Sequence, residues 1–305
     1  MEKFFTIYVC TYNSERIIEK CLASLLQLDH LSEFVEKIVV VDNNSNDSTK
    51  ELIIKWAKQY EIIKYEFEAK QGLAHARQHA AYANTEWVIY VDDDNLLGTN
   101  WLIELYNVAS NNNHIGVVNG AVIATPQEEL SCEEENCLRV IYRDLACTHL
   151  YGEDTVGSKN TIPMGAGMCI RTSALKFINS RGWITLEGRK GEKLSSGEDG
   201  ELCSLVFAQG YEYLFNPKMK LSHIIPKKRL QQEYVVKLIQ GLVEGRKGYL
   251  KTLSLGSLRC FIRKIKYFIL KKKNHYNENL YKFGSYEYWD VLVKRIIADT
   301  YIKKS

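Results

Sequence analysis

Short strand-like runs alternate with amphipathic helix-like stretches over residues 5–94, and this alternation constrains the fold more than any other feature. Four runs are rich in Val, Ile, Tyr and Phe, as buried strands are: 5–13, 35–45, 62–68 and 86–94. Helices are predicted between them over 14–27, 48–60 and 72–83. Strands that alternate with helices in this way form a parallel sheet with helices on both faces. The pattern predicts an α/β nucleotide-binding half.

Polar residues gather where these strand-like runs end. The runs finish in TYN, VDNNSND and VDDDN, and ligands of open α/β sheets bind beyond the carboxyl ends of the strands. Three consecutive aspartates, Asp92, Asp93 and Asp94, repel one another unless a cation lies among them. In an extended backbone, residues two apart point to the same side, so we expect Asp92 and Asp94 to face one site and Asp93 to face elsewhere.

Two common phosphate-binding motifs are missing from the first turn. Neither G-x-G-x-x-G nor G-x-x-x-x-G-K-[ST] occurs in the chain. The turn instead offers Thr11, Tyr12 and Asn13. These side chains suit stacking on a base and hydrogen bonding to it better than wrapping a pyrophosphate in glycine backbone.

Length and composition predict a globular protein of the cytoplasm. The chain has 305 residues, of which 46% are hydrophobic, enough for a large core divided into one or two domains. No run approaches the ~20 apolar residues of a membrane-spanning helix, and the N-terminus lacks a signal-peptide cleavage site. The eight cysteines include no Cys-x-x-Cys pair, so free thiols in a reducing cytosol are expected.

Charge is divided unevenly along the chain. Residues 226–305 hold 19 Lys and Arg against 6 Asp and Glu, a net charge of +13, whereas residues 1–225 carry 21 against 31, a net charge of −10. Within the basic tail, residues 257–273 place apolar side chains on one face of a predicted helix. Such a helix can lie in an anionic membrane interface or pack on the acidic body, and the sequence leaves both open. No nucleic-acid motif accompanies the lysines, so no nucleic-acid partner is expected.

Six segments together resemble glycosyltransferase family 2, the inverting enzymes with a GT-A fold. The resemblance covers roughly residues 4–225, and the segments follow the family's order: TYNSERIIEKCLASLL, IVVVDNNSNDST, QGLAHARQHA, VDDDN, MGAGMCIRTSAL and SGEDGELCSLVFAQGYEYLFNPKMKLSHIIP. The resemblance implies a Rossmann-like nucleotide-sugar-binding half, about 1–120, fused to an acceptor and catalytic half, about 121–225, with a mostly parallel central sheet. Residues 226–305, which it does not cover, would form a helical C-terminal appendage.

On the donor side, the resemblance implies that the aspartates bind a divalent cation, Mn²⁺ or Mg²⁺, that bridges the two phosphates of a nucleotide-sugar. Asp94 would be the direct ligand, and Asp92 would serve the ribose or a metal-bound water. His223 would be a further ligand, which favours Mn²⁺. The alternatives are an Asp-rich turn that caps the next helix and a structural histidine.

The same resemblance assigns the nucleotide. Asp42 would accept hydrogen bonds from the base edge and Tyr12 would stack on the ring, which favours UDP. Arg77 would help to hold the diphosphate, and Gly72 would let its loop approach the donor. A simple turn at Asp42 and an exposed helix arginine at position 77 are the alternatives. The full predicted nucleotide-sugar set is Thr11, Tyr12, Asn13, Glu15, Asp42, Gly72, Arg77, Asp92 and Asp93.

On the acceptor side, Asp199 matches the family's catalytic base and Glu198 would support the acceptor or the loop. Both acids could instead cap the helix that follows them. The small residues Gly165, Ala166 and Gly167 match the segment beneath the donor sugar, where they would permit close approach of the chain and the ligand.

These features predict a metal-dependent inverting glycosyltransferase that uses a nucleotide-sugar donor and a glycan or lipid-linked acceptor in cell-surface polysaccharide or glycan assembly. It would work in the cytoplasm, with its basic tail available to the inner face of the membrane. A sugar-phosphate nucleotidyltransferase is a second hypothesis, but its glycine-rich N-terminal loop with an arginine is missing. A non-catalytic nucleotide-sugar-binding module is a third, against which the intact Asp94 and Asp199 argue.

Overall fold

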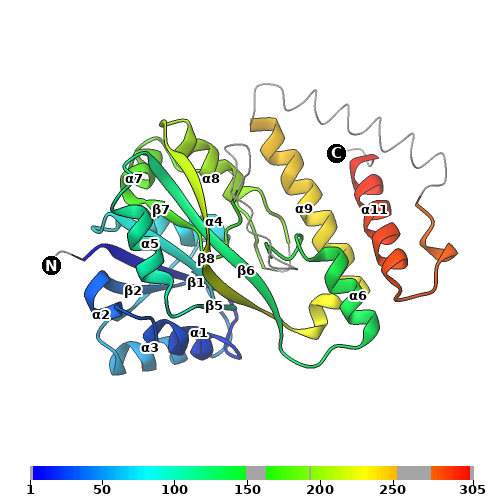
Figure 1. Ribbon diagram of the computed structural model, residues 1–305, viewed down its shortest axis with the longest axis horizontal. Coiled ribbons are helices and arrows are strands. Elements are labelled where there is room, and N and C mark those ends of the chain that lie inside the picture. Colours follow the sequence, from blue (N-terminus) through cyan, green and yellow to red (C-terminus); the bar gives the residue numbers. More distant parts are fainter. Residues whose placement is uncertain (1–2, 149–162, 192–193, 253–275, 303–305) are drawn as a thin grey trace.

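A mixed eight-stranded sheet forms the centre of the molecule, with helices on both of its faces (Figure 1). The computed structural model describes residues 3–148, 163–191, 194–252 and 276–302. The strands are ordered β3-β2-β1-β4-β7-β6-β8-β5 across the sheet. This architecture is the predicted α/β class.

The first four strands are parallel neighbours and correspond to the four predicted runs. They are β1 (Phe5–Thr11), β2 (Val35–Asp42), β3 (Ile63–Phe67) and β4 (Trp87–Asp92). The connecting helices are α1 (Ile18–Leu26), α2 (Leu31–Phe34), α3 (Thr49–Gln59) and α4 (Leu73–Gln78), which continues into the 3-10 turn η1 (His79–Tyr82). Every residue of β1 is buried, which explains why this strand is apolar without alternation.

The second half of the sheet adds antiparallel pairs. Its strands are β5 (Asn95–Leu97), β6 (Ile115–Pro126), β7 (Cys169–Arg171) and β8 (Glu212–Ile225), and its helices are α5 (Trp101–Ala109), α7 (Thr172–Ser180) and α8 (Glu198–Phe207). β7 pairs antiparallel with both β4 and β6, β5 pairs antiparallel with β8, and β6 and β8 run parallel. The sheet is therefore parallel in its N-terminal half and mixed in the rest.

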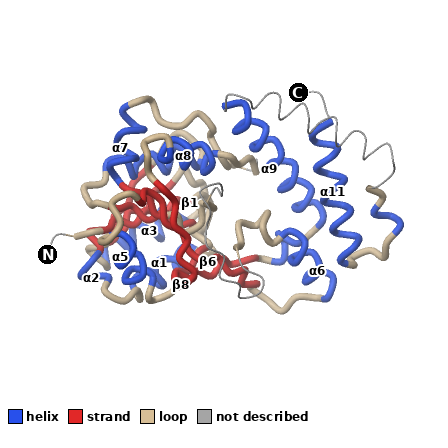
Figure 2. The backbone as a smooth tube through the Cα atoms, turned by 45° about the horizontal axis from the view of Figure 1, so that its top comes forward, coloured by secondary structure: helices blue, strands red, loops and turns tan. Residues whose placement is uncertain are grey.

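A hydrophobic core lies on each face of the sheet, beneath the helices that Figure 2 shows around the strands. One contains buried side chains of α1, α3 and α5, such as Leu22, Ile53 and Trp101. The other contains side chains of α4, α7 and α8, such as Leu175 and Val206. Burying a side chain of this size contributes roughly 1.5–3 kcal/mol to the free energy of unfolding. Packing on both faces therefore fixes the sheet that carries the loops at its carboxyl edge.

A layer of helices lies beside the sheet, where the long strands β6 and β8 extend beyond the other strands (Figure 1). It consists of α6 (Cys132–Ile141), α9 (Gln232–Thr252) and α11 (Tyr286–Ile302), with the short turns η2 (Lys227–Leu230) and η3 (Glu278–Leu280). α6 belongs to the predicted acceptor half, yet it packs with α9 and α11 in one core. The predicted helix over 257–273 lies outside the described residues. No helix in the described part of the chain is long and apolar enough to cross a membrane.

Candidate functional site

The loops after β1 and β2 are joined by hydrogen bonds from side chains to backbone. Asn13 Oδ1 accepts from the Asn46 N–H at 2.9 Å, and Glu15 Oε2 accepts from the Ser48 N–H at 3.1 Å. Asn13 has a φ of 52°, in the left-handed region that asparagine tolerates better than most residues. Asn13 and Glu15 thus fix the loop on which the half-buried Tyr12 lies.

Asp42 ends β2 and is almost fully buried, with 1% of its surface exposed. Its Oδ1 accepts from the Ser45 N–H at 2.9 Å, and its Oδ2 accepts from the Tyr65 hydroxyl at 3.1 Å. Burial and the neighbouring Asp42 raise the pKa of Tyr65 to about 12, so this hydroxyl stays a donor. Both oxygens of Asp42 are therefore held in place from within the protein.

Asn43, the next residue, anchors the loop before α4. Its Oδ1 accepts from the Gly72 N–H at 2.8 Å, and its Nδ2 donates to the Lys70 carbonyl at 2.8 Å. Gly72 has a φ of 139°, which side-chain-bearing residues rarely adopt. The glycine therefore permits the turn through which the chain enters α4.

The three aspartates do not form one extended strand. β4 ends at Asp92, and Asp93 and Asp94 make a turn into β5. The rule that side chains alternate along a strand consequently applies only as far as Asp92. No helix follows the turn, and the next one, α5, has Asn100 at its N-cap, so the helix-capping alternative for the aspartates is wrong.

Asp93 faces the loop after β1. It accepts hydrogen bonds from the hydroxyls of Thr11, at 2.7 Å, and Ser14. Burial and the adjacent charge of Asp94 raise the pKa of Asp93 to about 6, against the effect of these two donors. Asp93 thus connects the aspartate turn to the β1 loop.

Asp94 lies in a buried cluster with His223 and Arg229. The antiparallel pairing of β5 with β8 sets Asn95 opposite His223, which brings His223 Nε2 within 3.3 Å of Asp94 Oδ2. Arg229 Nη2 donates to Asp94 Oδ2 at 2.7 Å, and Asn95 Nδ2 donates to Asp94 Oδ1 at 2.9 Å. Burial alone would raise the pKa of Asp94, but His223 and Arg229 outweigh it and hold this pKa well below its usual value.

The donor set of this cluster fits a cation that shares its coordination with a ligand. Among the described residues, no group of three or more His, Cys, Asp or Glu side chains could hold a metal by itself. Asp94 Oδ2 and His223 Nε2 nevertheless converge on one point, and both are types of group that bind Mn²⁺. Cations in phosphate-transfer sites commonly take only one or two protein carboxylates and complete their shell with phosphates and water.

Arg77 joins the aspartate turn to the acids of α8. Its side chain is 2% exposed, its Nη1 donates to Asp199 Oδ1, and its Nη2 lies 3.7 Å from Asp92 Oδ1. Glu198 Oε1 is 3.9 Å from the same guanidinium. The alternative of a solvated helix arginine is therefore wrong. The donor-side aspartates and the acceptor-side acids of α8 both lie beside the buried guanidinium of Arg77.

Asp199 and Glu198 do not cap their own helix. α8 follows Gly197, whose φ is 115°, and no side chain caps the helix end. Burial and the charge of Asp199 raise the pKa of Glu198 to about 7, against the effect of Arg77. Glu198 Oε2 is buried and has no hydrogen-bond partner among the described residues. Within the described part of the chain, one buried oxygen of Glu198 is thus left without a partner beside Asp199.

Gly165 lies directly against the pair formed by Arg77 and Asp199. A Cβ atom at this position would lie 2.5 Å from both Arg77 Nη2 and Asp199 Oδ2, closer than real Cβ contacts. Gly167 has a φ of 67°. Gly165 therefore allows the backbone to pass beneath this ion pair, whereas Gly167 allows the chain to pass close to Trp101 and Leu221.

The sequence analysis missed two arginines of the site. Arg229 lies in η2, and Arg189, in the loop before α8, is near enough for its charge to act on Asp92, Asp94 and Glu198. Arg229 sits six residues after His223 in the basic run PKKR. That proximity to a predicted ligand is the one signal that could have identified it.

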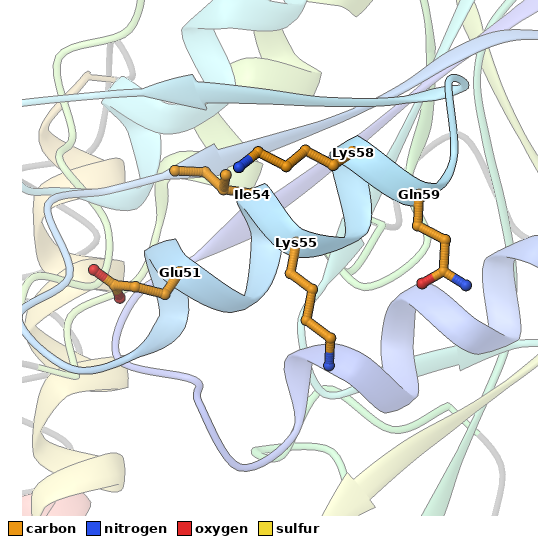
Figure 3. A pocket seen from close by; sticks show the side chains of 5 residues that line it. All are labelled: Glu51, Ile54, Lys55, Lys58 and Gln59. Carbon is orange, nitrogen blue, oxygen red and sulfur yellow. The ribbon is translucent and has the colours of Figure 1, made fainter.

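A separate surface hollow lies on α3, with a volume of about 600 Å³. Its lining residues come from that helix alone: Glu51, Ile54, Lys55, Lys58 and Gln59 (Figure 3). None of the predicted site residues contributes to it. The acid and arginine cluster is therefore the candidate site.

Comparison with known proteins identifies a family for this arrangement. The family model for glycosyl transferase family 2 matches residues 6–177, which is more than half of the chain. A glucosyl-dolichyl phosphate glucuronosyltransferase of Haloferax volcanii is 22% identical over 236 residues, covering 76% of this chain and 72% of that protein. A poly(ribitol-phosphate) beta-glucosyltransferase of Bacillus spizizenii is 32% identical over 110 residues, 35% of this chain, and this match spans only 17% of that relative's length.

Solved structures share the fold at low sequence identity. The mannosyltransferase PcManGT of Pyrobaculum calidifontis, in complex with GDP-Man and Mn²⁺, superposes with a TM-score of 0.59 at 18% identity, over 96% of this chain and 85% of that one. A TarS fragment of Staphylococcus aureus in complex with UDP-GlcNAc gives 0.55 at 17% identity, over 79% and 66%. Both likenesses lie in the architecture of the mixed sheet and its helices. The chain therefore belongs to glycosyl transferase family 2 and has the GT-A fold.

Proposed function

We propose that this protein is a metal-dependent inverting glycosyltransferase that moves a sugar from a UDP-sugar to an acceptor hydroxyl during polysaccharide or glycan assembly. The observation that carries the proposal is the position of Arg77, whose guanidinium contacts Asp199 and lies 3.7 Å from Asp92. A group suited to the donor and a group suited to the acceptor are thus held next to each other. A transfer reaction requires this proximity, because the reacting atoms must approach to about 3–3.5 Å.

Asp94 and His223 are the residues that would hold the divalent cation, together with the donor's diphosphate and water. When bound, Mn²⁺ or Mg²⁺ supplies positive charge to the leaving diphosphate. The chain contributes the placement of the two ligands, because the register of β5 against β8 fixes their separation. Asp92, on the Arg77 side of the turn, is available to the ribose or to a metal-bound water.

Asp199 would act as the base on the acceptor. An inverting transfer needs a proton acceptor on the face of the anomeric carbon opposite the leaving nucleotide, and Arg77 and Gly165 restrict the orientation of this carboxylate. Glu198 would bind the acceptor beside it. With a pKa raised to about 7, its unpartnered oxygen can exchange a hydrogen bond with a sugar hydroxyl near neutral pH.

The identity of the donor nucleotide can be tested by thermal shift. Tyr12 and Asp42 favour a uracil base, whereas the similar structures hold either UDP-GlcNAc or GDP-Man. We expect a UDP-sugar with Mn²⁺ to raise Tm more than GDP- or dTDP-sugars, since a ligand at 100 times its Kd stabilises the folded state by about 2.7 kcal/mol. Stabilisation by GDP-sugars alone would contradict the choice of UDP. NMR of the product should show an inverted anomeric configuration, and retention would contradict the mechanism.

We also propose that residues 257–273 contact an anionic membrane surface that carries a lipid-linked acceptor. The proposal rests on the net charge of +13 over residues 226–305 and on the apolar stripe of this segment, since each Lys or Arg near anionic lipid contributes ~1 kcal/mol. The intact chain should co-sediment with anionic vesicles but not with neutral ones, and less so at high salt. The triple substitution Phe261→Glu, Ile265→Glu and Phe268→Glu should weaken this binding, with folding checked by circular dichroism. An intact protein that stays in the supernatant throughout would show the proposal to be wrong.

A further inference from the structure

The guanidinium of Arg229 occupies the point on which the two candidate cation ligands converge. Its Nη2 donates to Asp94 Oδ2 at 2.7 Å, and its Nη1 lies 2.9 Å from His223 Nε2. The atoms Asp94 Oδ2 and His223 Nε2, 3.3 Å apart, are the same two atoms that would bind a divalent cation. The arginine and a metal ion therefore compete for the same two atoms.

We propose that Arg229 is the resident counter-cation of the Asp94 and His223 pair, and that a divalent cation binds only after this guanidinium is displaced. The inference rests on the proposed cation site. In the cation-free protein, a buried Asp94 without a positive partner would be costly, and Arg229 provides that partner. The exposed fraction of the side chain is 6% at His223, 11% at Asp94 and 17% at Arg229, so Arg229 is the most exposed member of the cluster.

The position of Arg229 in the fold suits such an exchange. It lies in η2, a turn of four residues between β8 and α9, and only its side chain contacts the cluster. Asp94 and His223 are instead fixed by the pairing of β5 with β8. The two ligands therefore stay in place when the metal replaces the guanidinium. Because the metal must break the contacts of Arg229, the free energy of these contacts makes metal binding less favourable.

Calorimetric titration of Mn²⁺ into the full chain without nucleotide tests this inference. Arg229→Gln should bind Mn²⁺ at least ~10-fold more tightly than the unchanged protein, because the metal no longer displaces charge-assisted hydrogen bonds. Lys228→Gln is the matched control, since Lys228 is exposed on the same turn and its loss changes the net charge equally. The control should leave the affinity near that of the unchanged protein.

A second measurement keeps the test independent of activity. Without metal, Arg229→Gln should have a lower Tm than the unchanged protein, and Mn²⁺ should raise that Tm by more than it raises the Tm of the unchanged protein. Should Arg229→Gln not fold, Arg229→Lys takes its place. It keeps the charge but loses the two-pronged geometry, so its Mn²⁺ affinity should still exceed that of the unchanged protein.

The outcomes separate this inference from the proposed function. Suppose that the unchanged protein binds Mn²⁺ with UDP present, while Arg229→Gln, or Arg229→Lys in its place, binds Mn²⁺ no more tightly than the unchanged protein. The role of Arg229 is then wrong and the cation site stands. An equal gain in Mn²⁺ affinity in Lys228→Gln would also overturn that role, because the loss of one positive charge anywhere on the turn would then explain the effect. If no variant binds Mn²⁺ even with UDP, both the cation site and the inference fail.

Discussion

Replacing Asp199 by asparagine should lower the turnover of glycosyl transfer by about 10²–10⁴-fold, the usual contribution of a general base, while donor affinity stays near that of the unchanged protein. A carboxylate is far too weak a base to deprotonate a sugar hydroxyl in advance. The proton must therefore move as the new glycosidic bond forms, when the attacking hydroxyl becomes acidic. Asparagine keeps the size of Asp199 and accepts hydrogen bonds, but it cannot take that proton.

The contact with Arg77 determines which measurements are needed. Asparagine replaces the ion pair with Arg77 by a hydrogen bond to a neutral amide. Because the Arg77 guanidinium also lies 3.7 Å from Asp92 and 3.9 Å from Glu198, Tm should be recorded beside kcat and the donor Kd. Glu201→Gln on the same helix is the matched control. Glu201 accepts from Thr185 and Leu186 in the preceding loop, so its loss should reduce stability more than turnover. A donor Kd that rises as much as kcat falls would assign Asp199 to donor binding instead.

The N-terminal sheet could be predicted because its signals are local. β2, at Val35–Asp42, is a run of β-branched residues that ends in polar loop residues, and the helix predicted over 48–60 is α3 at Thr49–Gln59. The helix predicted to start at Ser14 begins at Ile18 instead. Ser14 is engaged elsewhere, since its N–H donates to Thr49 Oγ1 at 2.8 Å. Long-range bonds of this kind shift a helix boundary without changing its apolar periodicity.

The local geometry at the aspartates was not predictable from strand periodicity alone. A run of three aspartates after a strand is compatible with an extended chain or with a turn, and only the pairing of β5 with β8 decides for the turn. That pairing depends on residues more than a hundred positions away. The prediction that Asp94 lies near His223 came from the family resemblance, because spacing along the chain does not encode it.

The arginines mark the limit of prediction from sequence most clearly. Arg77 and Asp199 are separated by 122 positions, and no periodic pattern links them. Arg229 lies in a basic run that looks like any solvated stretch of the tail, and it falls just beyond the predicted domain boundary at residue 225. Its importance appears only when η2 folds back onto the aspartate turn. Charge pattern predicts that such residues are exposed, and tertiary contacts override that expectation.

A chelator that removes divalent cations should abolish glycosyl transfer, and Asp94→Ala should prevent Mn²⁺ from restoring it. The alanine removes the carboxylate oxygen that lies 3.3 Å from His223 Nε2. Mn²⁺ would then lose one of its two protein ligands, and the donor would lose its link to the aspartate turn. We expect donor affinity measured with Mn²⁺ to fall at least ~10-fold.

The fold should survive the Asp94→Ala substitution, because the partly exposed Arg229 can turn to solvent when its partner is lost. Tm should therefore change much less than donor affinity, and donor affinity measured in chelator should be the same for Asp94→Ala and the unchanged protein. This last comparison is decisive, since a cation that acts through Asp94 can make no difference where there is no cation. Full activity in chelator would contradict metal dependence. A loss of donor affinity that persists without metal would instead assign Asp94 to direct contact with the nucleotide-sugar.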